Sequence, residues 1–169
     1  IQVKKIKIIF FIIFIFIDIL SAKENGVIYN ERDFFGSWHI HTKLKTKIKI
    51  NAILDAIEHY SKSHLYTTQV DAKFFDEKNN LIAIYRTDEK GSWKILNGKF
   101  ITKINECKLK TIKKDEDNPD FFIVDLVMDL TCNKKQHEEN EAKIISISPN
   151  KFIKQYKDDK NVTIYTRIK

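Results

Sequence analysis

Several residue types are scarce in this sequence of 169 residues, and their scarcity argues against whole classes of function. The four glycines form no phosphate-cradling loop, so a nucleotide-binding loop is not expected. Only three of the thirty basic residues are arginine, whose forked side chain reads bases and phosphates. The lysines that supply most of the net charge of +7 are scattered along the chain, which favours a solvated surface and no nucleic-acid partner.

Cysteine is equally scarce, with Cys107 and Cys132 alone, and two cysteines without spaced partners do not indicate a metal site. The ranges 101–112 and 121–132 both have the pattern of strands, and the charged, turn-forming residues between them predict a hairpin centred on residues 118–120. Cys107 lies opposite Cys132 in that hairpin, so we predict a disulfide. Two buried thiols that pack as small hydrophobic groups are the alternative.

The beginning of the chain has the layout of a secretory signal. Three lysines among the first seven residues precede an unbroken apolar run over 8–17, and Ala22 offers a cleavage point. The run is shorter than the twenty or so residues that span a bilayer. We therefore expect residues 1–22 to be a signal peptide or short N-terminal anchor and residues 23–169 to form one domain. The protein would be periplasmic or secreted, or anchored in the inner membrane if the segment is not cleaved.

The rest of the chain is mainly of β type, with one exception. Ile50, Ile53, Leu54, Ile57 and Tyr60 recur at steps of three and four residues, which predicts an amphipathic helix over 50–64 after a first strand at 34–49. Further strands are expected at 66–74, 81–86, 92–96, 99–112, 121–132, 143–148, 151–156 and 162–169. A turn is expected at 87–91, and Asn97 and Gly98 predict a tight two-residue hairpin. Such a series predicts an antiparallel up-and-down meander that closes into a barrel of about eight strands. A cystatin-like α+β fold, with the helix cradled by a curved sheet, is the alternative.

Two short segments resemble a known family. Gly36 and Trp38 in the first strand, and Gly91, Trp93 and the turn at Gly98 later on, resemble the glycine-x-tryptophan elements of small bacterial lipocalin-like (calycin-type) exported domains. The resemblance implies a lipocalin-like barrel in which Arg167 of the closing strand stacks over Trp38. The layout is also similar to that of periplasmic accessory proteins of the ToxS type, which implies an apolar ligand or an inner-membrane partner.

Inward-facing apolar residues are the candidates for a ligand site if the barrel holds a cavity. Most are expected to be plain core, and Trp38 and Trp93 would be natural walls because aromatic faces supply large apolar area. The residues assigned to such a site are Trp38, Ile40, Phe74, Trp93, Leu126 and Met128. The expected function is binding of an apolar small molecule or lipid, or of an envelope protein. A filled-core interaction protein of inhibitor or immunity type is the alternative.

No set of residues in the sequence predicts catalysis. No serine or cysteine stands in a recognisable nucleophile context, and Asp125 and Asp129 have the pattern of exposed carboxylates. His39 and His41 lie two residues apart, but a pair of histidines without a defined third ligand seldom binds a metal. We therefore expect no enzyme, no cofactor and no metal.

Overall fold

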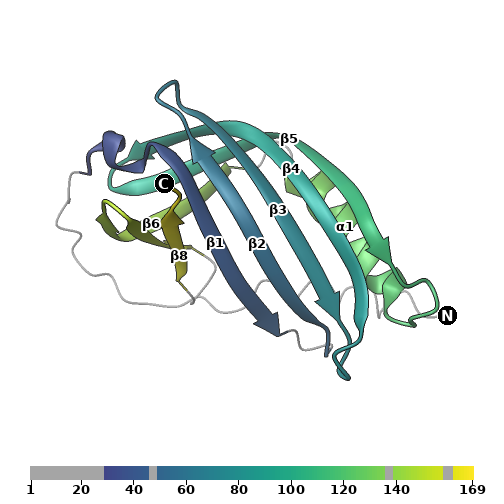
Figure 1. The fold of residues 1–169 in the computed structure, drawn as a ribbon. Coiled ribbons are helices and arrows are strands. Elements are labelled where there is room, and N and C mark those ends of the chain that lie inside the picture. The colour runs from purple at the N-terminus through teal and green to yellow at the C-terminus, as the bar shows by residue number, and fades with distance from the viewer. Residues whose placement is uncertain (1–28, 46–48, 136–138, 158–161) are drawn as a thin grey trace.

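The eight strands of the computed structural model pair in chain order, and β1 also pairs with β8, which closes an antiparallel barrel (Figure 1). The structure describes residues 29–45, 49–135, 139–157 and 162–169. The strands are β1 (Gly36–Lys45), β2 (Asn51–Tyr60), β3 (Leu65–Phe75), β4 (Leu81–Leu96), β5 (Lys99–Lys114), β6 (Glu139–Ser148), β7 (Lys151–Tyr156) and β8 (Thr163–Arg167). The predicted barrel is confirmed, whereas the expected signal segment 1–22 lies outside the described residues.

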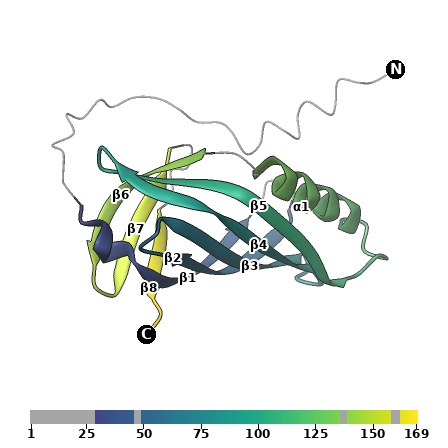
Figure 2. The ribbon, with the colours of Figure 1, turned by 90° about the horizontal axis from the view of Figure 1, so that it is seen from above.

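The barrel is closed in different ways at its two ends. Strand β6 pairs only with Lys99–Lys103 of the long strand β5, and β1 shares two paired positions with β8. Beside the remaining part of β5 lies the helix α1 (Phe121–Lys135), as Figures 1 and 2 show. Short strands therefore complete one end of the barrel, and a helix covers the other. No helix among the described residues is long and apolar enough to cross a membrane.

The end closed by strands is filled with aromatic side chains. Trp38 and Trp93 are both buried there in one cluster, with the short 3₁₀ helix η2 (Glu31–Phe34) packed over it. Each indole N–H has an acceptor: Trp38 Nε1 donates to the Phe34 carbonyl at 2.7 Å, and Trp93 Nε1 to the Ser61 carbonyl at 3.1 Å. The predicted inward direction of both tryptophans is confirmed. Around them pack Phe34, Tyr60, Tyr66, Phe100, Phe152 and Tyr165.

A second, smaller cluster lies under α1. Val124 of the helix is buried against Tyr85 and Ile82 of β4, and Met128 packs beside it. The Tyr85 hydroxyl donates a hydrogen bond of 2.8 Å to Asp125. The helix is thus held on the sheet by apolar contacts and by the partly buried hydrogen bond from Tyr85 to Asp125.

The helix expected over 50–64 is wrong, because these residues form β2. In the strand, Ala56, Glu58 and Tyr60 are buried inside the barrel, whereas Ile57 points outward and is 47% exposed. Because the inward positions include alanine and glutamate and an outward position is isoleucine, the sequence of β2 does not show the apolar–polar alternation typical of a strand. The apolar positions that remain happen to fall at helical steps.

The strand expected over 121–132 is also wrong, because these residues belong to α1. The helix begins after Asp120, whose carbonyl accepts a hydrogen bond from the Val124 N–H. The predicted disulfide is confirmed: Cys107 and Cys132 are bonded, with their Cα atoms 5.6 Å apart. It does not bridge a hairpin, as expected, but ties α1 to β5.

A third correction concerns residues 87–91, which were expected to form a turn. They continue β4 without interruption, and Thr87 and Glu89 are buried inside the barrel. The expected hairpin at Asn97 and Gly98 is confirmed, since both residues have positive φ, 52° and 75°, as a primed two-residue turn requires. The strands joined by that hairpin are the longest of the barrel.

Gly91 marks a point where two strands approach closely. The register of β4 and β5 shifts between Lys90 and Gly91, and a Cβ atom on Gly91 would lie well inside van der Waals contact with the Lys103 carbonyl. Gly36, at the start of β1, is also assigned a structural role; it has a φ of 109° and lies against the Arg167 side chain. Only glycine satisfies the packing at Gly91 without moving the backbone.

We expect Gly91→Ala to lower the free energy of unfolding by about 3 kcal/mol, because the added methyl group must push the backbone of β5 away. Urea unfolding followed by tryptophan fluorescence measures the change. Ala83→Gly, in the same strand, provides a control for a change of one methyl group in the opposite direction. A Gly91→Ala variant as stable as the parent would contradict this account of the strand crossing.

Candidate functional site

A cavity of about 220 Å³, partly open to solvent, lies inside the barrel next to the aromatic core, where strands β2 to β7 face one another. Its walls are mixed, with apolar, hydroxyl and charged side chains. Six of the nine residues that line it are at least nine-tenths buried, and two of the six are glutamates and two are threonines. Glutamate and threonine are seldom buried to this extent. The residues that line it are Glu58, Tyr66, Thr68, Val70, Glu89, Thr102, Ile104, Asn140 and Tyr156.

The centre of the cavity wall is a row of polar residues across three neighbouring strands. Thr68 of β3 is the paired residue of Glu58 in β2 on one side and of Glu89 in β4 on the other. Side chains at directly paired positions project from the same face of a sheet. The two carboxylates therefore flank the threonine hydroxyl inside the barrel, on strands about 10 Å apart.

Glu58 is balanced by a buried lysine from the opposite wall. Lys154 of β7 is 1% exposed, and its Nζ lies 3.7 Å from Glu58 Oε2. Tyr60 connects the two groups, because its hydroxyl donates to Glu58 Oε2 and accepts from Lys154 Nζ at 3.2 Å. The ammonium also lies over the rings of Tyr165 and Phe100, at 4.5 and 4.6 Å from their centroids. The interior of this barrel thus holds an organic cation among aromatic faces.

Burial and the carboxylates also act on the tyrosines around the cavity. Burial, and then the charge of Glu58, raises the pKa of Tyr60 and of Tyr66 well above the usual value. The nearby Thr68 hydroxyl acts on the pKa of Tyr66 in the opposite direction. Burial raises the pKa of Tyr165, and burial followed by the hydrogen bond to Asp125 raises that of Tyr85.

These four raised pKa values predict the behaviour of the protein in alkali. Tyr60, Tyr66, Tyr85 and Tyr165 should stay neutral in the folded protein at pH values where tyrosines of the unfolded chain, with a pKa of about 10, ionise. Their stabilising contribution is complete below that pH and declines as the pH rises above it. Absorbance at 295 nm should show these four of the six tyrosines ionising only together with unfolding. Reversible titration of all six in folded protein would contradict this.

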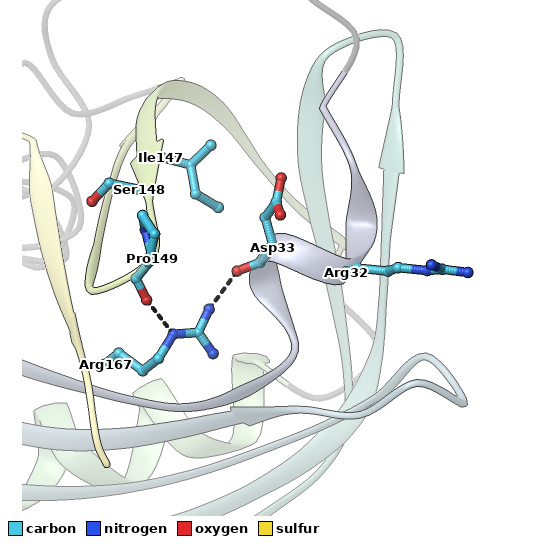
Figure 3. A pocket seen from close by; sticks show the side chains of 6 residues that line it. All are labelled: Arg32, Asp33, Ile147, Ser148, Pro149 and Arg167. Carbon is cyan, nitrogen blue, oxygen red and sulfur yellow. Dashed lines mark hydrogen bonds between the residues drawn. The ribbon is translucent and has the colours of Figure 1, made fainter.

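A larger hollow of about 430 Å³ lies outside the core, near the turn between β6 and β7 (Figure 3). The most prominent charged group of this hollow, the guanidinium of Arg167, already has partners within the protein. The guanidinium donates to the carbonyls of Pro149, Phe35 and Asp33 and lies 4.1 Å over the ring of Trp38. The side chain therefore joins the end of the chain to its beginning. We regard the smaller interior cavity as the candidate site because it contains the buried polar groups.

The two histidines singled out in the sequence lie on the outer face of β1. His41 Nδ1 is 2.6 Å and His39 Nε2 is 3.7 Å from the same oxygen of Asp55. All three side chains are more than one-third exposed. Within the described ranges, no group of three or more His, Cys, Asp and Glu side chains is placed to hold a metal.

The six residues assigned to a ligand site from the sequence are distributed over three places. Trp38, Ile40 and Trp93 belong to the filled core, and Phe74 and Met128 pack against the cluster under α1. Leu126 points away from that cluster and is 47% exposed. None of the six lines the interior cavity. Their role in binding stays a prediction.

Sequence reasoning missed the residues that form the cavity wall. Glu58 was assigned to a helix and Glu89 to a turn, so neither was expected inside a barrel. A signal was present, since Tyr66, Thr68, Val70, Ala72 and Phe74 alternate cleanly in β3. Threonine in an inward position of such a row indicates a polar patch in the core. The strands on either side could not be aligned with it before their registers were known.

The resemblance to lipocalin-like domains rests on few residues. Arg167 stacks over Trp38, as the resemblance implied, and Gly36 lies against the Arg167 side chain. The strand with Trp93 ends in the tight turn at Gly98. Membership of the family stays a prediction, because no family model matches the chain and no curated protein matches it in sequence.

Proposed function

We propose that this protein binds a small molecule inside its barrel, in the cavity bounded by the buried row of Glu58, Thr68 and Glu89. The observation that carries the proposal is a polar-lined space next to a core that is otherwise densely filled. Buried polar groups are unfavourable unless they are hydrogen-bonded, and the hydroxyl of Thr68 makes no hydrogen bond of normal geometry among the described residues. Stability alone does not account for buried polar side chains at this place, because apolar side chains would fill the space without that cost.

The size and lining of the cavity support a compact ligand with polar groups. Its volume of about 220 Å³ is below the range of roughly 300–1,000 Å³ for sites that enclose drug-sized ligands. Long-chain lipids are disfavoured for the same reason. Val70 and Ile104 provide apolar walls, so a ligand with one small apolar part and one polar end fits best.

We also propose that the protein acts outside the cytoplasm, in the periplasm or as a secreted protein. The disulfide between Cys107 and Cys132 supports this location, because such bonds persist mainly in oxidising compartments.

Filling the cavity tests the proposed function. In Val70→Phe a ring occupies the space, whereas in Thr67→Phe the same ring points outward from an exposed position of the same strand. Native mass spectrometry of the purified full chain, together with fluorescence titration with phenethylamine, 2-phenylethanol and decanoate, should detect a bound molecule in the parent and in Thr67→Phe only. If Val70→Phe bound as well as the parent, the cavity would not be the site.

An interaction protein remains the second candidate function, because α1 exposes several apolar side chains. Phe122 is 73% exposed, and Leu126 and Leu130 are 47% and 41% exposed. Exposed apolar groups of this kind are typical of contact with a protein partner. An envelope protein that binds the parent but not the double variant Phe122→Ser/Leu126→Ser, with ligand binding unchanged, would support this function.

A further inference from the structure

The polar row of the cavity has the composition of a binding site for a positively charged group. Glu58, Thr68 and Glu89 lie on adjacent strands at directly paired positions, and all three line the cavity. Each is at least nine-tenths buried. The row therefore presents two carboxylates and a hydroxyl to one small volume.

The hydroxyl of Thr68 indicates that a group of the ligand belongs next to it. The residue is 5% exposed, and its Oγ1 makes no hydrogen bond of normal geometry within the described part of the chain, although the Tyr66 hydroxyl lies close enough to interact with it. A buried hydroxyl without a partner is unfavourable, and the great majority of such groups in native proteins are satisfied. A donor on the ligand would satisfy it.

The charges around Thr68 decide the kind of donor. Of the described residues that line the cavity, two are glutamates and none is lysine or arginine. A carboxylate has about four lone-pair sites, so Glu58 and Glu89 can each accept from a ligand in addition to their partners within the protein. An anionic ligand would lie beside the carboxylates of Glu89 and Glu58, of which only Glu58 has Lys154 next to it, and this is unfavourable.

The shape of the donor follows from the row. A primary ammonium carries three N–H donors, which matches acceptors on three adjacent strands. Tyr66 and Tyr156 add aromatic surface to the same cavity, and aromatic faces attract cations. Lys154 shows that an ammonium is already accommodated between Glu58 and aromatic rings in this barrel.

We propose that the ligand of this cavity is a small organic cation with a primary ammonium group and a short apolar part. The ammonium donates to Thr68 Oγ1 and to the carboxylates of Glu58 and Glu89, and the apolar part lies against Val70 and Ile104. This inference rests on the proposed function, since it names the class of ligand for the same cavity.

A series of ligands that differ in charge alone tests the class. Isothermal titration of the full chain at pH 7.5 uses phenethylamine, 2-phenylethanol and phenylacetate, which share a ring and a short linker. We expect phenethylamine to bind at least tenfold more tightly than the alcohol, and phenylacetate to bind most weakly. Equal or tighter binding of the alcohol or the acid would overturn the cation proposal while the proposed function stands. Failure of all three to bind would overturn both.

Two variants test whether the ammonium group binds at the row of Glu58, Thr68 and Glu89. Glu89→Gln should weaken phenethylamine binding at least tenfold and leave 2-phenylethanol binding within about twofold. Thr68→Val keeps the shape of the side chain, removes the unsatisfied hydroxyl and should weaken amine binding about tenfold, so it decides the matter if Glu89→Gln fails to fold. Asp88→Asn removes a carboxylate from the outer face of the same strand and should have no effect. Unchanged amine affinity in Thr68→Val would contradict the proposed geometry.

Discussion

Replacement of Lys154 by methionine should lower the free energy of unfolding by about 4 kcal/mol. The lysine is almost completely buried and is the cation that faces Glu58, which is itself 7% exposed. Methionine keeps the length and apolar stem of the side chain but leaves the carboxylate buried without its ammonium. Breaking one half of a buried ion pair is strongly destabilising for this reason, although the intact pair need contribute little net stability.

Removal of Glu58, the partner of Lys154, provides the decisive comparison. In the double variant Glu58→Gln/Lys154→Met neither charge is present, and the glutamine oxygen can still accept from the Tyr60 hydroxyl. We expect the double variant to recover most of the stability that Lys154→Met loses. Lys151→Met, at an exposed position of β7, should change stability by less than about 0.5 kcal/mol. Urea unfolding followed by tryptophan fluorescence measures all four proteins. A double variant as unstable as Lys154→Met would show that the lysine acts through packing rather than charge.

The same buried polar residues explain where prediction from the sequence succeeded and where it failed. The hairpin at Asn97 and Gly98 and the clean alternation of β3 follow ordinary rules, and both were predicted. In β2 and β4 the rule is inverted, since Glu58 and Glu89 point inward. Alternation of apolar and polar residues cannot be recognised where a charged side chain occupies the core. Departures from local rules of this kind are expected at functional positions.

The error at α1 has a different physical origin. Phe121, Val124, Met128 and Cys132 recur at steps of three and four residues and face the sheet, which is a helical pattern. Apolar residues also occupy the outer side of this helix, so alternating positions are apolar too. A sequence that satisfies both periods cannot be assigned by period alone. The tertiary contact with β4 and β5 selects the helix, and that contact cannot be read from one segment.

The disulfide between Cys107 and Cys132 should contribute about 3.5 kcal/mol to the free energy of unfolding, and the double variant Cys107→Ala/Cys132→Ala should lose that amount. The bond joins residues 25 positions apart, and closing a loop of that length restricts the unfolded chain. In the folded state α1 is also held by Val124 and by the hydrogen bond from Tyr85 to Asp125, so we expect the helix to keep its place in the variant.

Reductant separates the effect of the bond from that of the two substitutions. Parent protein unfolded in urea with dithiothreitol should be as unstable as the double variant, and the double variant should be indifferent to dithiothreitol. A parent that loses less than about 1 kcal/mol on reduction would show that the packing of α1 on β4 and β5 is sufficient by itself. Because α1 covers the end of the barrel that the short strands leave open, a large loss would mean that the barrel depends on an oxidising compartment for much of its stability. The proposed location outside the cytoplasm would then also be the condition under which the fold is stable, because the disulfide persists there.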